Sequence, residues 1–116
     1  MIQWGKVWSD LFIFLALTSN IGFIVSNDPY QLVIAVGVNL IATVLKFNIK
    51  KLLAAELLAT AFISDLHLIP AAVLYFSGSS PSLVTGLAVG AAVANVLSVV
   101  IIVIDIIMSY HYPEER

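Results

Sequence analysis

LLAAELLATAFISDLHLIPAAVLYF, residues 52–76, is the stretch that decides the fold of this chain. It is long enough to cross the hydrocarbon core of a bilayer as a helix, which takes about 20 apolar residues. Three ionisable side chains, Glu56, Asp65 and His67, nevertheless lie within it, and Pro70 follows them. A charged side chain at the centre of a membrane helix costs about 2.5 to 3.5 kcal/mol on insertion scales, so we treat such residues as candidate functional sites. The stretch therefore predicts a transmembrane helix with a functional centre.

The composition places the whole chain in the membrane. Of its 116 residues, 61 % are hydrophobic and 10 % are charged, a balance too apolar for a small water-soluble domain. About four spans of roughly 20 residues use up this length, so we expect one domain, residues 1–116. The formal charge of -2 comes without an acidic or basic run, which argues against nucleic acid as a partner. The chain has no cysteine, which excludes disulfides, thiolate metal sites and cysteine nucleophiles.

Turn-forming and charged residues divide the chain into four apolar spans. SNDPY at 26–30 and SGSSPS at 77–82 have the composition of turns, and FNIKK at 47–51 carries charge. Hydrocarbon offers no partner to a free backbone N–H or C=O group, and the period-2 pattern of a membrane barrel is absent, so helices are expected. The fold class is thus all-α, an integral membrane four-helix bundle. The predicted spans are residues 7–26, 31–47, 52–76 and 83–108.

The basic residues predict the orientation. Lys46, Lys50 and Lys51 form the only basic cluster of the sequence, and positively charged loops stay in the cytoplasm. Both termini would then be cytoplasmic, an N-in and C-in topology, in a multi-pass protein of a bacterial inner membrane that contacts the lipid bilayer. The first span also has the charge-then-apolar order of a secretory signal. No A-x-A-like cleavage site follows it, so we expect it to be retained.

Three spans carry a polar side chain near their middle. At about 1.5 Å per helical residue, Asn39, Asp65 and Asn95 all lie close to the bilayer midplane. Lys46 and Glu56 lie at similar depth nearer the cytoplasm and are candidates for an ion pair. Hydroxyl side chains occupy the depths between these two levels: Thr43, Thr60, Ser64 and Ser98.

The third span presents two polar faces. At 100° per residue, Glu56, Thr60, Ser64 and His67 form one stripe and Asp65 points roughly opposite Glu56, so both faces need a protein cover in lipid. Pro70 removes one backbone donor and clashes with the preceding turn, which predicts a kink or an opening at 64–67. An opening would expose carbonyl groups to ions. An ordinary kink would instead leave Asp65 protonated and bonded to Asn39 or Asn95.

The fourth span carries small residues at every fourth position, which permits close contact with another helix. The pattern leaves open whether that helix belongs to the same chain or to a second protomer. The helix-packing residues are Ser82, Gly86, Gly90, Ala94 and Ser98.

The first functional hypothesis is ion transport, by a channel or transporter. Asp65 would bind a monovalent cation or carry a proton, with Asn39 and Asn95 as its hydrogen-bond partners. Four helices of one short chain pack around side chains rather than a pore, so this hypothesis requires a homo-oligomer. The rest of the proposed pathway is Glu56, Thr60 and Ser64, with His67 as a pH-sensitive element.

The alternative hypothesis is a non-catalytic structural role, as an accessory subunit of a larger membrane complex. Buried polar side chains join membrane helices for about 0.6 to 2 kcal/mol each without doing chemistry. The two hypotheses differ in whether the polar residues around Asp65 face water or protein.

Enzymatic activity is not expected. Ser64, Asp65 and His67 contain the groups of a nucleophile, an acid and a base, but they share one short helical segment without a supporting motif. Two divergent ligands are also too few for a tight metal site. We therefore expect no catalytic residues, no metal and no cofactor.

The chain resembles two groups of membrane proteins. In size and span count it is similar to the small multidrug transporters, which dimerise around a carboxylate in the first helix; here Asp10 lies near the membrane edge instead. AELLATAFISDLHLIPA at 55–71, with WGKV at 4–7 and the lysine-rich central loop, more closely resembles a group of small bacterial inner-membrane proteins of unknown function. That resemblance supports the bacterial location and implies no activity.

Overall fold

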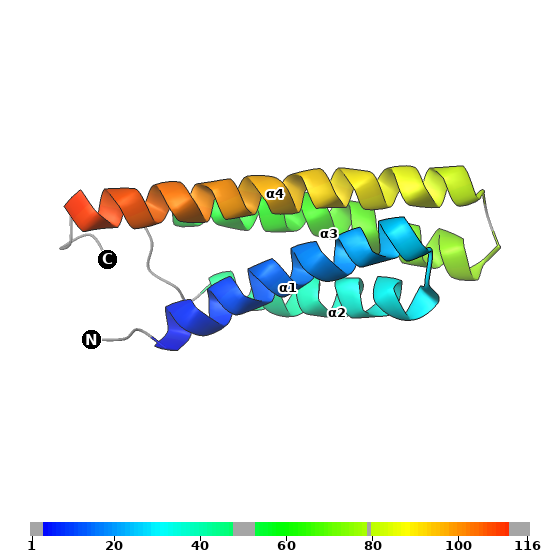
Figure 1. Cartoon of the computed structure of the whole chain (residues 1–116), viewed down its shortest axis with the longest axis horizontal. Helices are drawn as coiled ribbons and strands as arrows, with labels where there is room; N and C mark the ends of the chain where they lie inside the picture. The colour runs from blue at the N-terminus through cyan, green and yellow to red at the C-terminus, as the bar shows by residue number, and fades with distance from the viewer. Residues whose placement is uncertain (1–3, 48–52, 79, 112–116) are drawn as a thin grey trace.

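The computed structural model describes residues 4–47, 53–78 and 80–111, and these ranges contain helices and no strand. The predicted all-α class is confirmed, and each helix is long and apolar enough to cross a membrane. The basic residues Lys50 and Lys51 of the central loop lie outside the described residues. The helices are α1 (Trp4–Ser26), α2 (Pro29–Lys46), α3 (Ala54–Phe76) and α4 (Pro81–His111) (Figure 1).

Local chemistry sets the end of α1 and the start of α2. The Asp28 carboxylate accepts a hydrogen bond from the Tyr30 N–H at 3.0 Å, which caps α2, and Pro29 fits its first turn because proline has no N–H to leave unsatisfied there. Asn27 adopts a left-handed φ of 58°, which ends α1 and reverses the chain. Both α2 and α4 therefore begin two residues before the predicted spans, at Pro29 and Pro81.

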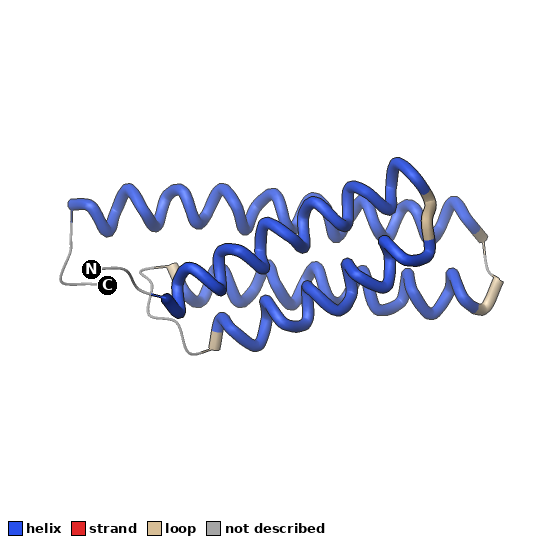
Figure 2. Tube along the Cα trace, turned by 60° about the horizontal axis from the view of Figure 1, so that its bottom comes forward, coloured by secondary structure: helices blue, strands red, loops and turns tan. Residues whose placement is uncertain are grey.

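The four helices run alternately up and down, and each contacts its two neighbours in the ring α1–α2–α3–α4. We call the end where α1 begins and α4 finishes the terminal end, and the opposite end, with the α1–α2 and α3–α4 connections, the turn end (Figures 1 and 2). This arrangement agrees with termini on one side of the membrane. The assignment of that side to the cytoplasm stays a prediction.

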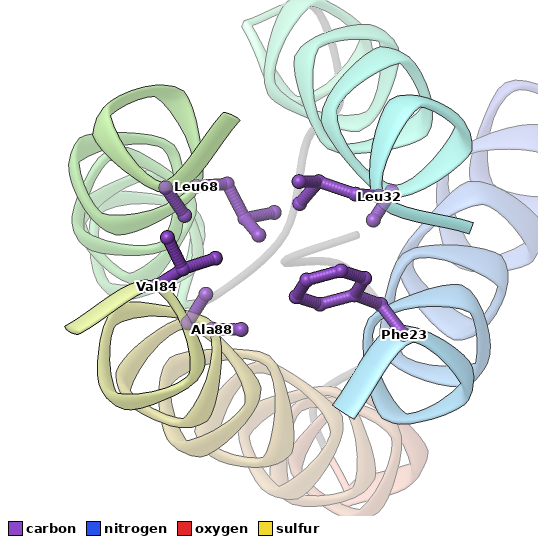
Figure 3. Packing of buried hydrophobic residues seen from close by; sticks show 8 residues of the cluster. Phe23, Leu32, Leu68, Val84 and Ala88 are labelled. Atoms are coloured by element: carbon purple, nitrogen blue, oxygen red, sulfur yellow. The ribbon is translucent and has the colours of Figure 1, made fainter. Parts of the chain in front are cut away.

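The interior has an apolar cluster in each half. The turn-end cluster takes side chains from all four helices, which point toward the bundle axis (Figure 3). Its members are Phe23, Leu32, Ala35, Leu68, Ala71, Val84, Ala88 and Ala91. The smaller terminal-end cluster has at its centre Ile13, Ala42, Leu57 and Ile102.

Pro70 does not break α3, which is a continuous helix over Ala54–Phe76. The predicted opening of the backbone at 64–67 is therefore wrong. Pro70 is exposed on the outer surface of the bundle, and its missing N–H removes one hydrogen bond of the helix. Leu68 and Ala71, before and after Pro70 in the sequence, are both buried in the turn-end cluster and support the helix there.

Candidate functional site

A layer of buried polar side chains separates the two apolar clusters. We call it the polar layer, and α2, α3 and α4 supply it. The predicted gathering of polar residues at mid-depth is thus present inside the bundle. Its members are Asn39, Thr43, Thr60, Ser64, Asp65, Asn95 and Ser98.

Asp65 bonds to α2 through one of its two carboxyl oxygens. Thr43 Oγ1 lies 2.7 Å from Asp65 Oδ2 and also 2.9 Å from the carbonyl oxygen of Asn39. The other oxygen, Oδ1, is buried and has no hydrogen-bond partner among the described residues. The prediction that Asp65 bonds to the amide of Asn39 or Asn95 is therefore wrong. Its hydrogen-bond partner is the hydroxyl of Thr43.

Asn39 pairs with Ser64 instead. Ser64 Oγ donates to Asn39 Oδ1 at 2.9 Å, and Asn39 Nδ2 donates to the carbonyl of Ala35 at 2.9 Å. Ser64 and Asp65 are adjacent in the sequence, so consecutive residues of α3 both contact α2. Asn95 is buried on α4.

On its other side, α3 bonds to α4. The hydroxyl groups of Thr60 and Ser98 lie 2.6 Å apart, and Thr60 Oγ1 donates to the carbonyl of Leu57 at 2.9 Å. Asp65 and Thr60 thus lie at opposite edges of one wide buried face, with Ser64 between them. The central residues of both polar faces, Thr60, Ser64 and Asp65, are covered by protein, as the cost of exposing them to lipid requires.

Lys46 and Glu56 do not form the predicted ion pair. Glu56 is exposed, while Lys46 is only 6 % exposed and its Nζ donates to the Leu57 carbonyl at 3.3 Å. The difference arises because Glu56 lies just outside the buried face of α3. The Lys46 ammonium also acts electrostatically on the Asp65 carboxyl, one turn of α2 beyond Thr43. The charged side chain that acts on Asp65 is therefore Lys46 of α2.

His67 faces α4 and not Asp65. Its Nδ1 lies 2.8 Å from the carbonyl oxygen of Ile63, and its ring packs against Gly90. Gly90, together with the buried Ala94 and Ser98, therefore serves contacts within this chain. Gly86 has open space where a Cβ would lie. The small-residue pattern thus divides into a packed part and an open part.

Sequence reasoning missed two buried polar residues that join helices. Asn20 of α1, in the amide orientation that satisfies both atoms, donates to the Ala88 carbonyl at 3.2 Å and accepts from the Ala92 N–H at 3.0 Å. Asp105 of α4 accepts from the Leu53 N–H at 3.2 Å, at the start of α3. Both follow the helical spacing of buried neighbours, which is a signal that the sequence does contain.

No three His, Cys, Asp or Glu side chains of the described ranges gather closely enough to hold a metal ion. The groups available in the polar layer are hydroxyls, amides, one carboxyl and, beside it, one ammonium. This set can hold a proton or make hydrogen bonds between helices.

These features define a small multi-pass membrane protein whose four apolar helices contact the lipid bilayer and enclose a polar layer. The chain belongs to a family of unknown function (DUF6394), whose family model matches residues 26–106. The resemblance to a group of proteins of unknown function is thereby confirmed. Searches of curated proteins and of solved structures find no match to the chain.

Proposed function

We propose that this protein moves a proton or a monovalent cation across a bacterial inner membrane, with Asp65 as the binding group. The observation that carries the proposal is the carboxyl at mid-bundle, with one oxygen bonded to Thr43 and the other buried and without a hydrogen-bond partner in the described part of the chain. An ionisable group at this depth is costly, and a purely structural contact could be made by an amide or a hydroxyl at lower cost.

One bundle is not by itself an open channel. The turn-end cluster fills the interior of that half with side chains (Figure 3), and ions do not pass a packed apolar core. Transport therefore needs a change in helix packing or a second copy of the chain, and we propose a homo-oligomer without enzymatic activity. Gly86 of α4, with open space at its Cβ position, allows a neighbouring helix to approach closely.

Flux into liposomes tests the proposal. Purified wild type is compared with Asp65→Asn, which keeps the shape of the side chain and removes its charge. Asp105→Asn is the matched control, because it changes the other deeply buried carboxyl and keeps an acceptor for the Leu53 N–H. We expect proton or cation flux in wild type and Asp105→Asn, and its loss in Asp65→Asn. Equal flux in all three proteins would exclude Asp65 as the binding group.

The second candidate is an accessory subunit of a larger membrane complex. The hydrogen bonds of the polar layer that join α3 to α2 and α4 favour it, because they hold the helices together without leaving a pore. If no protein conducts, and Asp65→Asn folds as stably as wild type, this candidate replaces the first.

A further inference from the structure

The hydrogen-bond inventory around Asp65 indicates which ion it holds. A threonine hydroxyl has one hydrogen to donate, yet Thr43 Oγ1 lies within bonding distance of two acceptors, Asp65 Oδ2 and the Asn39 carbonyl. With Asp65 as a carboxylate, Thr43 shares its one hydrogen between the two acceptors. With Asp65 as a carboxylic acid, Oδ2–H would donate to Thr43 and Thr43 would donate to Asn39, so that each contact would have a hydrogen of its own. The bare Oδ1 is then the carbonyl oxygen of a neutral acid, which costs less to bury than half of a carboxylate.

A metal cation fits this site less well than a proton. Monovalent and divalent cations bound by oxygen need several ligands around them. Around Asp65 the neighbouring Thr43 hydroxyl is already bonded, a lysine ammonium acts on the carboxyl, and Oδ1 is buried without a hydrogen-bond partner among the described residues. A proton needs no surrounding set of ligands, because it bonds directly to the carboxyl oxygen.

The two sides of Asp65 differ in polarity. Toward the terminal end lie Thr43, the bonded hydroxyls of Thr60 and Ser98 and the Lys46 ammonium, next to the smaller apolar cluster of that end. Toward the turn end the next buried residue of α3 is Leu68, a member of the larger turn-end cluster, and the buried Asn20 of α1 at that depth has both amide atoms bonded to the backbone of α4. Proton transfer proceeds along polar and hydrated groups and not through packed hydrocarbon side chains.

The helices packed against α3 are α2 and α4, and few titratable groups on them face Asp65. On α2, Lys46 acts on it and Tyr30 is exposed at the turn end. On α4, the buried Asp105 bonds at the start of α3. On α3 itself, Glu56 is exposed and His67 faces Gly90. Lys46 is therefore the charged group along the terminal-side route.

We propose that, in the helix packing described here, Asp65 binds a proton and exchanges it only with the terminal end of the bundle, through Thr43 and past Lys46, while the turn-end cluster acts as a seal that transport would have to open. The inference rests on the proposed function in taking Asp65 as the binding group, and it adds the ion and the side of access. No bond other than O–H changes: water on the terminal side gains the proton that Asp65 loses.

Infrared spectroscopy on vesicles tests the proposal. Asp65 is assigned by the protonated-carboxyl band that Asp65→Asn removes, or that Asp65→Glu shifts if the first variant does not fold. Because the chain has no cysteine, a membrane-impermeant thiol reagent on Ser82→Cys, exposed at the turn end, sorts vesicles by orientation. A pH step is then applied to one face at a time.

We expect a step at the terminal end to change the Asp65 band at once, and a step at the turn end to change it only as fast as the vesicle interior equilibrates. An immediate response from the turn end, or the absence of any protonated-carboxyl band that depends on Asp65, would overturn the proposal. This readout is separate from flux. A one-sided response without flux would retain the one-sided exchange and reject transport. Flux with a two-sided response would retain transport and reject the one-sided exchange.

Two leucines of α3 give a matched pair for the seal. Leu68 in the turn-end cluster and Leu57 in the terminal-end cluster are each 1 % exposed and lie on either side of Asp65. Leu68→Thr adds a hydroxyl to the seal and should make the band respond at once from both faces. Leu57→Thr adds the same group on the terminal side and should keep the response one-sided. Identical behaviour of the two variants would show that the turn-end cluster is not the seal.

Discussion

The imidazole of His67 on α3 lies directly against Gly90 on α4, so that a Cβ added at Gly90 would meet the ring Cδ2 at 2.5 Å. The ring is also held by the contact of its Nδ1 with the Ile63 carbonyl. The absence of a side chain at position 90 is therefore what lets α3 and α4 approach here.

Gly90→Ala should destabilise the protein by about 1 to 3 kcal/mol, because the methyl group overpacks this contact. The measurement is the free energy of unfolding in detergent micelles. Gly37→Ala on α2 is the control, since its Cβ would meet no atom within 4 Å, and it should be neutral or gain up to about 1 kcal/mol from helix propensity. Adding His67→Ala to Gly90→Ala should restore part of the loss, and no restoration would contradict this account of the contact.

Thr43→Val should cost about 1 to 3 kcal/mol of unfolding free energy, because the valine is similar in shape but leaves the Asp65 carboxyl without its hydrogen bond. Thr18→Val is the control: Thr18 is exposed and its hydroxyl donates only to the Leu15 carbonyl of its own helix, so the change should stay within about 0.5 kcal/mol. If the two variants lose the same stability, the bond to Asp65 adds nothing to the bundle.

Asp105→Leu should loosen the start of α3, because it leaves the Leu53 N–H without its acceptor. The loss should be about 1 to 3 kcal/mol, and amide hydrogen exchange in the first turn of α3 should become faster while the turn end of the same helix keeps its protection. Asp105→Asn retains an oxygen acceptor and should exchange nearly as slowly as wild type. Unchanged exchange in Asp105→Leu would show that this cap is dispensable.

Asn20→Leu should weaken the contact between α1 and α4. The variant keeps the branched outline of the side chain and removes two hydrogen bonds to the backbone of α4 at Ala88 and Ala92. Buried polar contacts between membrane helices contribute about 0.6 to 2 kcal/mol, and the unfolding free energy should fall by an amount in that range. A variant as stable as wild type would mean that packing alone joins these two helices.

Much of the fold could be read from contiguous residues. The turns at Asp28–Pro29 and around Gly78 were recognised because their backbone conformations depend on local chemistry. The depth of Asn39, Asp65 and Asn95 followed from counting residues along each helix. All three are buried in the bundle, because a polar side chain at that depth is far costlier in lipid than against protein.

The partners of those side chains could not be read in the same way. Depth along a helix says nothing about how far the helix is rotated or which helix lies beside it. The sequence predicts a hydrogen bond from Asp65 to an amide side chain, and its partner is the hydroxyl of Thr43. The sequence also predicts an ion pair between Glu56 and Lys46, and Glu56 is exposed instead. Pro70 was expected to allow an opening of α3, and packing on both sides keeps the helix continuous.

The sequence by itself therefore determined the four membrane-spanning helices, the positions of their turns and the polar character of their centre, because hydrophobicity and turn chemistry act between near neighbours in the chain. Only the tertiary structure decided that Thr43 bonds Asp65, that His67 packs against Gly90, and that a polar layer lies between two apolar clusters of the interior. These features depend on the rotation and order of the helices, which are set by the packing of all four together.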